Sequence, residues 1–151
     1  MTIDVRGVCP LLQVFDMNAA LAFYRDTLGF SVVRKAESAG SVSWALLRLN
    51  GAEVMLNAAF EKDRKPSTPD PSRIAAHQDT SLFFNCADVD AVYSHFRAQG
   101  WDVKEPTTRD YGRRVLSVFP EVRGLTNRWS ARVADKVPSP NSRSRGAQLN
   151  R

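Results

Sequence analysis

The sequence lacks any uninterrupted apolar run long enough to cross a bilayer, although 43% of its 151 residues are hydrophobic. A membrane-spanning helix needs about 20 mostly apolar residues, so we expect a soluble protein without a membrane partner. The first ten residues, MTIDVRGVCP, lack the basic-then-apolar order of a secretory signal. Cysteine is scarce, with only Cys9 and Cys86. We interpret both as reduced thiols of a cytoplasmic protein, because disulfides are rare in the cytosol.

The positive charge of the chain is small and unevenly placed. Of the formal charge of +5, the segment 133–151 contributes +3, from four basic residues against one acidic residue, so residues 1–132 carry only +2. The segment is rich in Pro, Ser, Asn and Arg and has little to bury, which predicts a basic, disordered tail after a single domain at 1–132. A solvated tail is favoured over a nucleic-acid arm, so no nucleic-acid partner is expected.

Two stretches have the same pattern and predict a repeated helix: DMNAALAFYRDTLGF at 16–30 and DVDAVYSHFRAQGW at 88–101. Each begins with an aspartate, Asp16 or Asp88, where an N-cap would accept free backbone N–H groups. Apolar residues follow at helical spacing, and a glycine stands near each end. The pattern predicts two copies of one amphipathic helix.

Strand-like segments flank both helices in the same order. One precedes each helix and three follow it: 8–15, 30–37, 41–50 and 52–60 in the first copy, and 80–87, 101–106, 113–119 and 123–129 in the second. The chain therefore predicts a β-α-β-β-β module at 8–59, a polar connection at 60–79 and a second module at 80–129. Because one helix covers one face of a sheet, the open faces need a partner, within one chain or between two.

Three motifs, FDMNAALAFYRDTLGF, ADVDAVYSHFRAQG and DYGRRVLSVF, together resemble the glyoxalase / bleomycin-resistance / extradiol-dioxygenase superfamily, or vicinal oxygen chelate fold. The resemblance covers residues 8–129. It implies an α+β fold in which the two modules form a curved, mixed eight-stranded sheet around a cavity. It also implies a homodimer whose pockets are built by both chains. Since this fold hosts both metalloenzymes and metal-free drug-binding proteins, function has to be argued from the site.

The family's enzymes hold a divalent metal at four positions in the paired strands. In this sequence the corresponding positions are Cys9, Asn57, Ser81 and Asn127. None is the His or Glu that such a site would be expected to use. Glu53 and Gln13 are the only substitutes in the relevant strands, while His77 lies in the connection and His95 inside the second helix. We therefore expect no metal, no cofactor and no catalytic residue, and whether any enzymatic activity survives stays open.

Strand alternation and the family register together predict a set of ligand-binding side chains on the inward faces of the strands. These are Leu11, Gln13, Trp44, Arg48, Met55, Asn57, Ser81, Phe83, Asn85 and Trp129. Apolar residues with a few polar anchors are typical of a small-molecule pocket, although a collapsed core would use the same residues. Cys86 is expected on the helix-facing side with Leu82 and Phe84.

The favoured interpretation is a metal-free protein that binds a small hydrophobic or aromatic ligand, for example by sequestering an antibiotic and so conferring resistance. The alternative is a metal-dependent lyase, isomerase or dioxygenase of the same superfamily. The segment PEVRG at 120–124 replaces the family's acidic hairpin, so the register of the last strand stays open. The identity of the ligand also stays open.

Overall fold

The computed structural model describes residues 3–4, 6–60, 64–76, 81–118 and 128–133. The described residues form the two expected β-α-β-β-β modules, which confirms the α+β fold. The first module contains β1 (Leu11–Val14), α1 (Met17–Leu21), a π-helical turn η1 (Ala22–Thr27), β2 (Ser31–Ser38), β3 (Ser41–Leu49) and β4 (Ala52–Ala58). The second contains β5 (Ser81–Cys86), α3 (Val89–Ala98), β6 (Thr107–Thr108), β7 (Arg114–Val118) and β8 (Arg128–Val133). A short helix, α2 (Pro71–Ala76), lies in the connection.

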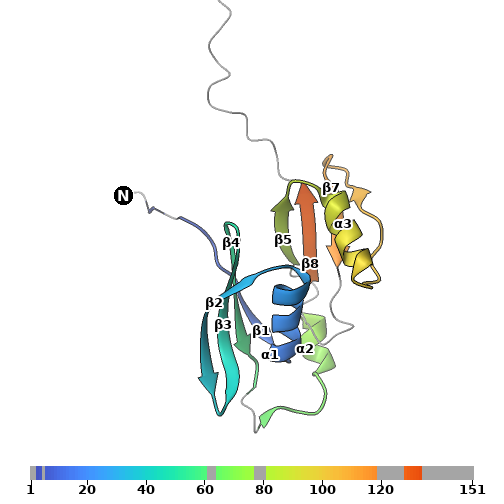
Figure 1. Cartoon of the computed structure of the whole chain (residues 1–151). Helices are drawn as coiled ribbons and strands as arrows, with labels where there is room; N and C mark the ends of the chain where they lie inside the picture. Colours follow the sequence, from blue (N-terminus) through green and yellow to red (C-terminus); the bar gives the residue numbers. More distant parts are fainter. Residues whose placement is uncertain (1–2, 5, 61–63, 77–80, 119–127, 134–151) are drawn as a thin grey trace, which may run out of the picture.

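Within the described residues, the strands form two four-stranded sheets, ordered β1-β4-β3-β2 and β5-β8-β7-β6, rather than one eight-stranded sheet. In each sheet the first strand pairs in parallel with the last strand of its module, and the other pairs are antiparallel. Figure 1 shows the first sheet at the left, the second at the right and α1 between them. The expectation of a single sheet is therefore corrected, because among the described pairings β1 bonds only to β4 and β5 only to β8, so no ladder joins the two sheets.

Both helices begin as the sequence predicts. The Asp16 carboxylate accepts a hydrogen bond from the Ala19 backbone N–H at 3.0 Å. The Asp88 carboxylate accepts from the N–H groups of Asp90 at 2.9 Å and Ala91 at 3.0 Å. These bonds satisfy donors that have no partner in the first turn of a helix.

The first helix departs from the expected regular α-helix after Leu21. It continues as the π-helical η1, and the Leu28 N–H donates to the carbonyl of Phe23, five residues earlier, at 3.0 Å. The wider turn buries two consecutive aromatic side chains, Phe23 and Tyr24, each 4% exposed. An α-helical pattern does not predict this, because adjacent residues are 100° apart in an α-helix.

One strand prediction in the second module was wrong. Residues 101–106 form no strand, and β6 is limited to Thr107–Thr108. Trp101 and Val103 are instead buried in the core ahead of β6, where packing outweighs strand propensity. The last strand, β8, is described from Arg128 to Val133, while residues 123–127 of the strand predicted at 123–129 lie outside the described residues. The predicted metal position Asn127 and the tail after Val133 lie outside the described residues.

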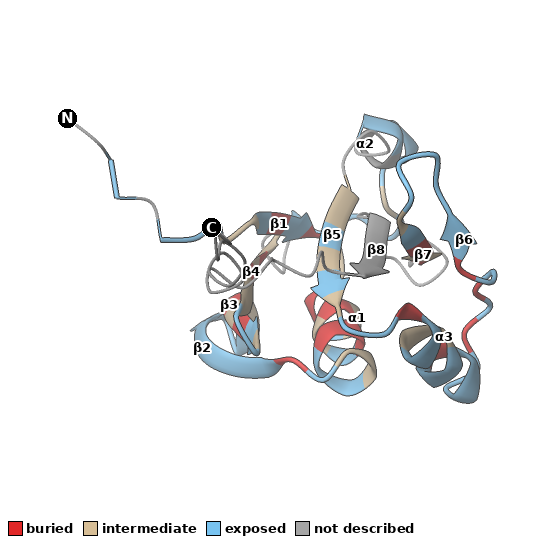
Figure 2. Cartoon of the chain, turned by 90° about the horizontal axis from the view of Figure 1, so that it is seen from above, coloured by how far each residue is buried: buried red, intermediate tan, exposed pale blue. Residues whose placement is uncertain are grey.

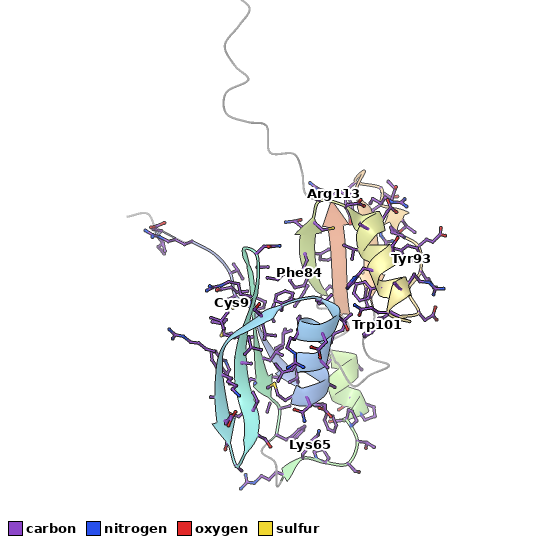
Figure 3. The ribbon with its side chains drawn as sticks, in the orientation of Figure 1. Cys9, Lys65, Phe84, Tyr93, Trp101 and Arg113 are labelled. Atoms are coloured by element: carbon purple, nitrogen blue, oxygen red, sulfur yellow. The ribbon has the colours of Figure 1, made fainter. Side chains whose placement is uncertain are left out.

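One hydrophobic core joins the modules. The Trp101 ring lies edge-on to Phe23 at 5.2 Å between ring centroids and to Phe96 of α3 at 5.8 Å. Phe30, which follows η1, meets Phe84 of β5 at 5.8 Å. Figure 2 shows how much of α1 is buried, and the side chains of Trp101 and Phe84 appear in Figure 3. In the described part of the chain, no helix is long and apolar enough to span a membrane.

Replacing Trp101 with Ala should lower the free energy of unfolding by about 3–5 kcal/mol, because a large buried ring that bridges both modules is lost. Urea denaturation followed by circular dichroism measures this. The control is Tyr111→Ala, since Tyr111 is 62% exposed and its removal should change stability by less than about 0.5 kcal/mol. Equal effects of the two substitutions would contradict the shared core.

Candidate ligand-binding site

The face of the first sheet that carries no helix brings together six of the predicted ligand-binding residues. The strand register aligns Leu11 with Met55, Gln13 with Asn57, Asn57 with Trp44, and Arg48 with Glu53. Directly paired residues point to the same side of a sheet. Their sequence neighbours Leu12, Leu47 and Val54 are buried in the core on the opposite side. We call this surface, which includes Leu11, Gln13, Trp44, Arg48, Met55 and Asn57, the open face of the first sheet.

In β5 of the second sheet the predicted alternation is observed. Leu82, Phe84 and Cys86 pack against the core as expected. Ser81, Phe83 and Asn85 alternate with them, and Phe83 is 49% exposed. The register pairs Trp129 of β8 with Leu82 and Val118 of the core-facing rows, whereas Phe83 pairs with Ser130. The backbone therefore does not place Trp129 in the row of Phe83.

A cavity of about 980 Å³ lies between the two modules, and residues from both faces of β5 line it. Its walls come from the residues after η1, the strand β5, the helix α3 and the turn between β3 and β4. The main apolar contributors are Leu28, Phe30, Leu82, Phe84, Val92 and Phe96. Of the nine predicted residues whose side chains are described, which excludes Trp129, only Phe83 and Asn85 line this cavity. The sequence predicted that Leu82 and Phe84 lie on the helix-facing side of β5, but it did not predict that they line a cavity. Their alternation along the strand was the signal that could have suggested this role.

His95 stands at this cavity and also links the two modules. Its Nε2 atom lies 2.7 Å from the carbonyl oxygen of Thr27 in η1 and 3.0 Å from the side-chain nitrogen of Gln99. The residue is exposed. Through its Nε2 atom, His95 of α3 links the second module to η1 of the first.

The one ion pair on the open face of the first sheet, among the described residues, joins Arg48 and Glu53. Arg48 donates from Nε at 2.8 Å and from Nη2 at 2.6 Å, and both bonds end on Oε1 of Glu53. The Met55 N–H donates to the carbonyl of Pro10 at 2.8 Å, so the chain before β1 still runs beside β4. Cys9 is therefore level with Glu53.

Both thiols of the chain are free. Burial raises the pKa of the Cys9 thiol, the negative charge of Glu53 adds to this, and a hydrogen bond with the Met55 backbone opposes it. Burial likewise raises the pKa of the Cys86 thiol. Neither cysteine is an activated nucleophile, since nucleophilic cysteines need a lowered pKa.

The residues at the family's metal positions do not fit a divalent cation. Across the described ranges, no three His, Cys, Asp or Glu side chains gather closely enough to hold a metal. Glu53, the substitute ligand suggested by the sequence, already shares its Oε1 with the guanidinium of Arg48. That fixed positive charge would repel a divalent cation at the same place.

The fold and cavity define a class of protein: paired β-α-β-β-β modules that enclose an apolar site. The model of the Glyoxalase/Bleomycin resistance protein/Dioxygenase superfamily matches residues 8–127. The chain belongs to this superfamily, as the sequence motifs indicated. None of the curated protein sequences compared with the chain matches it significantly.

Several solved structures share the fold. TnmS3, an antibiotic binding protein from Streptomyces sp. CB03234, is 18% identical with a TM-score of 0.59, over 86% of this chain and 97% of its own. A bleomycin-binding protein complexed with bleomycin is 15% identical with a TM-score of 0.62, over 87% and 100%. Lactoylglutathione lyase from Agrobacterium tumefaciens is 18% identical with a TM-score of 0.60, over 85% and 94%. Antibiotic-binding proteins and an enzyme are thus about equally similar, so the site has to distinguish between them.

The effect of the Glu53 charge on the pKa of the Cys9 thiol can be tested by the rate of thiol alkylation. Glu53→Gln should speed the reaction of Cys9 with iodoacetamide at pH 8, because loss of the negative charge lowers the Cys9 pKa and increases its thiolate fraction. Peptide mass spectrometry follows Cys9 and Cys86 separately. Glu37→Gln is the control, since that carboxylate pairs with Lys35 at 2.7 Å on β2. An unchanged Cys9 rate in Glu53→Gln would show that the two groups do not interact.

Proposed function

We propose that the protein captures a bulky, partly aromatic small molecule, such as an antibiotic, by stoichiometric binding without a metal. The cavity between the modules carries this proposal. Its volume of about 980 Å³ suits a drug-sized molecule, and its walls are mostly apolar and aromatic with a few polar groups. The fold shared with TnmS3 and with the bleomycin-binding protein supports the same class of function.

Affinity in such a site comes from burial of apolar surface, and its polar groups fix the orientation of the ligand. Phe83 and Phe84 supply accessible rings to the walls, and Phe83 is 49% exposed. A ligand ring packed against one of them gains roughly 1–3 kcal/mol. Two such contacts would therefore change the dissociation constant by a factor of about 30 to about 20,000.

The alternative, a metal-dependent lyase, isomerase or dioxygenase, has less support. Such an enzyme needs at least three ligands around an open coordination position. The neutral side chains at Asn57 and Ser81 and the Arg48–Glu53 ion pair argue against that arrangement. We therefore propose that binding persists after treatment with a chelator.

We further propose that the protein is a homodimer in the cytoplasm. The open face of the first sheet and the neighbouring strand β2 leave large apolar side chains exposed, with Leu11 at 50% and Val33 at 40%. Contact with a second chain would cover this surface and bring further polar side chains, such as Gln13 and Asn57, to a shared pocket. The free thiols of Cys9 and Cys86 are in keeping with a reducing compartment.

The proposed cavity can be separated from the open face with two matched substitutions. Phe83 and Leu11 are 49% and 50% exposed, but only Phe83 lines the cavity. Phe83→Ala should weaken binding of the neutral fluorescent dye Nile red about tenfold, because an apolar wall is lost, whereas Leu11→Ala should change it less than twofold. Fluorescence titration with and without EDTA measures both effects. A reversed order would move the site to the open face, and loss of binding in EDTA would contradict metal independence.

The oligomeric state gives a separate test. Light scattering coupled to size-exclusion chromatography should return about twice the 16.8 kDa of one chain at micromolar concentration. Leu11→Glu should shift the protein toward a monomer, because a buried, unpaired carboxylate destabilises an apolar interface. The exposed and distant Tyr111→Glu serves as the control. A monomeric wild-type protein would rule out the shared pocket but not the cavity within one chain.

A further inference from the structure

Among the described residues that line the cavity, Glu53 is the only carboxylate, and neither Lys nor Arg is present. Its Oε1 atom accepts both hydrogen bonds from Arg48, whereas no described residue donates a hydrogen bond to Oε2. Arg48 itself does not line the cavity. Glu53 is therefore the member of the ion pair that borders the cavity.

The other polar side chains at the cavity are less available. His95 is bonded to the carbonyl of Thr27, and Asn85 also has a protein partner. Asn50 lies in the exposed turn between β3 and β4. An ionised oxygen beside apolar walls loses water when a ligand enters, and it then requires a donor to replace that water. Oε2 of Glu53 is thus the acceptor that an incoming ligand has to satisfy.

We propose that the cavity selects ligands that place an ammonium group or another N–H donor against Oε2 of Glu53, and that it rejects ligands with a carboxylate or phosphate at that point. This inference rests on the small-molecule binding proposed above and narrows the ligand class to aromatic or apolar amines. An anion at that point would meet Glu53, the only charged side chain among the described residues that line the cavity, while Arg48 is bonded to the other oxygen, Oε1, and does not line it.

The net charge of +5 does not reverse this preference. At physiological ionic strength, charges more than about 8 Å apart are largely screened. The exposed basic residues elsewhere on the protein therefore act weakly on a ligand inside the cavity. A direct charge-assisted hydrogen bond to Oε2 is short and is less weakened by salt.

Three naphthalene compounds that differ mainly in one group provide the test: 1-naphthylmethylamine, 1-naphthylmethanol and 1-naphthylacetate. Their affinities for the full-length protein are measured by displacement of Nile red at pH 7 and 150 mM salt. The cationic amine should bind about tenfold more tightly than the alcohol and at least tenfold more tightly than the carboxylate, because only the amine brings a charged donor to Oε2.

Two variants assign the preference to Glu53. Glu53→Gln should reduce the affinity for the amine about tenfold and leave that for the alcohol within twofold. The double variant Arg48→Gln/Glu53→Gln keeps the net charge unchanged and should lose the preference in the same way. Glu37→Gln, which alters a carboxylate bound to Lys35 outside the cavity, should behave as the wild type. Thermal unfolding of each variant confirms that it is folded.

The outcomes separate this inference from the proposed function. Suppose that Nile red binding depends on Phe83. Equal affinities for the three compounds would then overturn the selectivity and leave the binding function intact. An unchanged preference in both Glu53 variants would do the same. Tighter binding of the carboxylate than of the amine would overturn the selectivity as well. If neither Nile red nor any of the three compounds bound the wild-type protein, both proposals would fail.

Discussion

Trp101 packs edge-on against Phe23 of the first module and Phe96 of the second, at 5.2 and 5.8 Å between ring centroids. This contact joins the segment that contains η1 to α3. The contact between His95 of α3 and the Thr27 carbonyl of η1 links the same two segments at a second point. Buried aromatic pairs of this kind add to the energy of simple area burial and constrain ring orientation. The space between the modules exists because the two helical segments meet at these rings and not along their full length.

The described strands form two separate sheets, because no hydrogen-bonded ladder joins a strand of one to a strand of the other. Each sheet then has one face covered by helix, with Leu56 and Leu116 fully buried there. On the other face of the first sheet, polar and apolar residues such as Gln13 and Leu11 alternate with the core positions. A sheet with an exposed apolar face of this kind is suited to association with another surface.

The ion pair of Arg48 and Glu53 bears on whether the first sheet could hold a metal. The sequence suggested Glu53 as a substitute metal ligand on this sheet, and Arg48 stands directly across from it in the strand register. The guanidinium binds Oε1, where it weakens the attraction of a cation, and no described residue donates a hydrogen bond to Oε2. One fold can in this way serve chemistry or simple binding, because function resides in the side chains placed on it.

The N-caps, the order of the strands and the faces of β1, β4 and β5 follow from the sequence alone. Asp16 and Asp88 act within one helical turn, and alternation along a strand is a local property, so neither depends on distant contacts. Sequence patterns also found Leu82 and Phe84 on the helix-facing side. They could not show that this side encloses a cavity, because periodicity tells which residues face inward but not how far apart two inward faces lie.

Only the tertiary structure decided the remaining features. The π-helical turn at Phe23 and Tyr24, and the loss of the strand expected at Trp101, arise because these rings are drawn into the contact between the modules. The pairing of Arg48 with Glu53 depends on the β3–β4 register, and the cavity depends on where η1, β5 and α3 come to rest. Sequence therefore determined the elements and their faces, while long-range packing determined the spaces between them, because a cavity is a property of distances that local propensities do not encode.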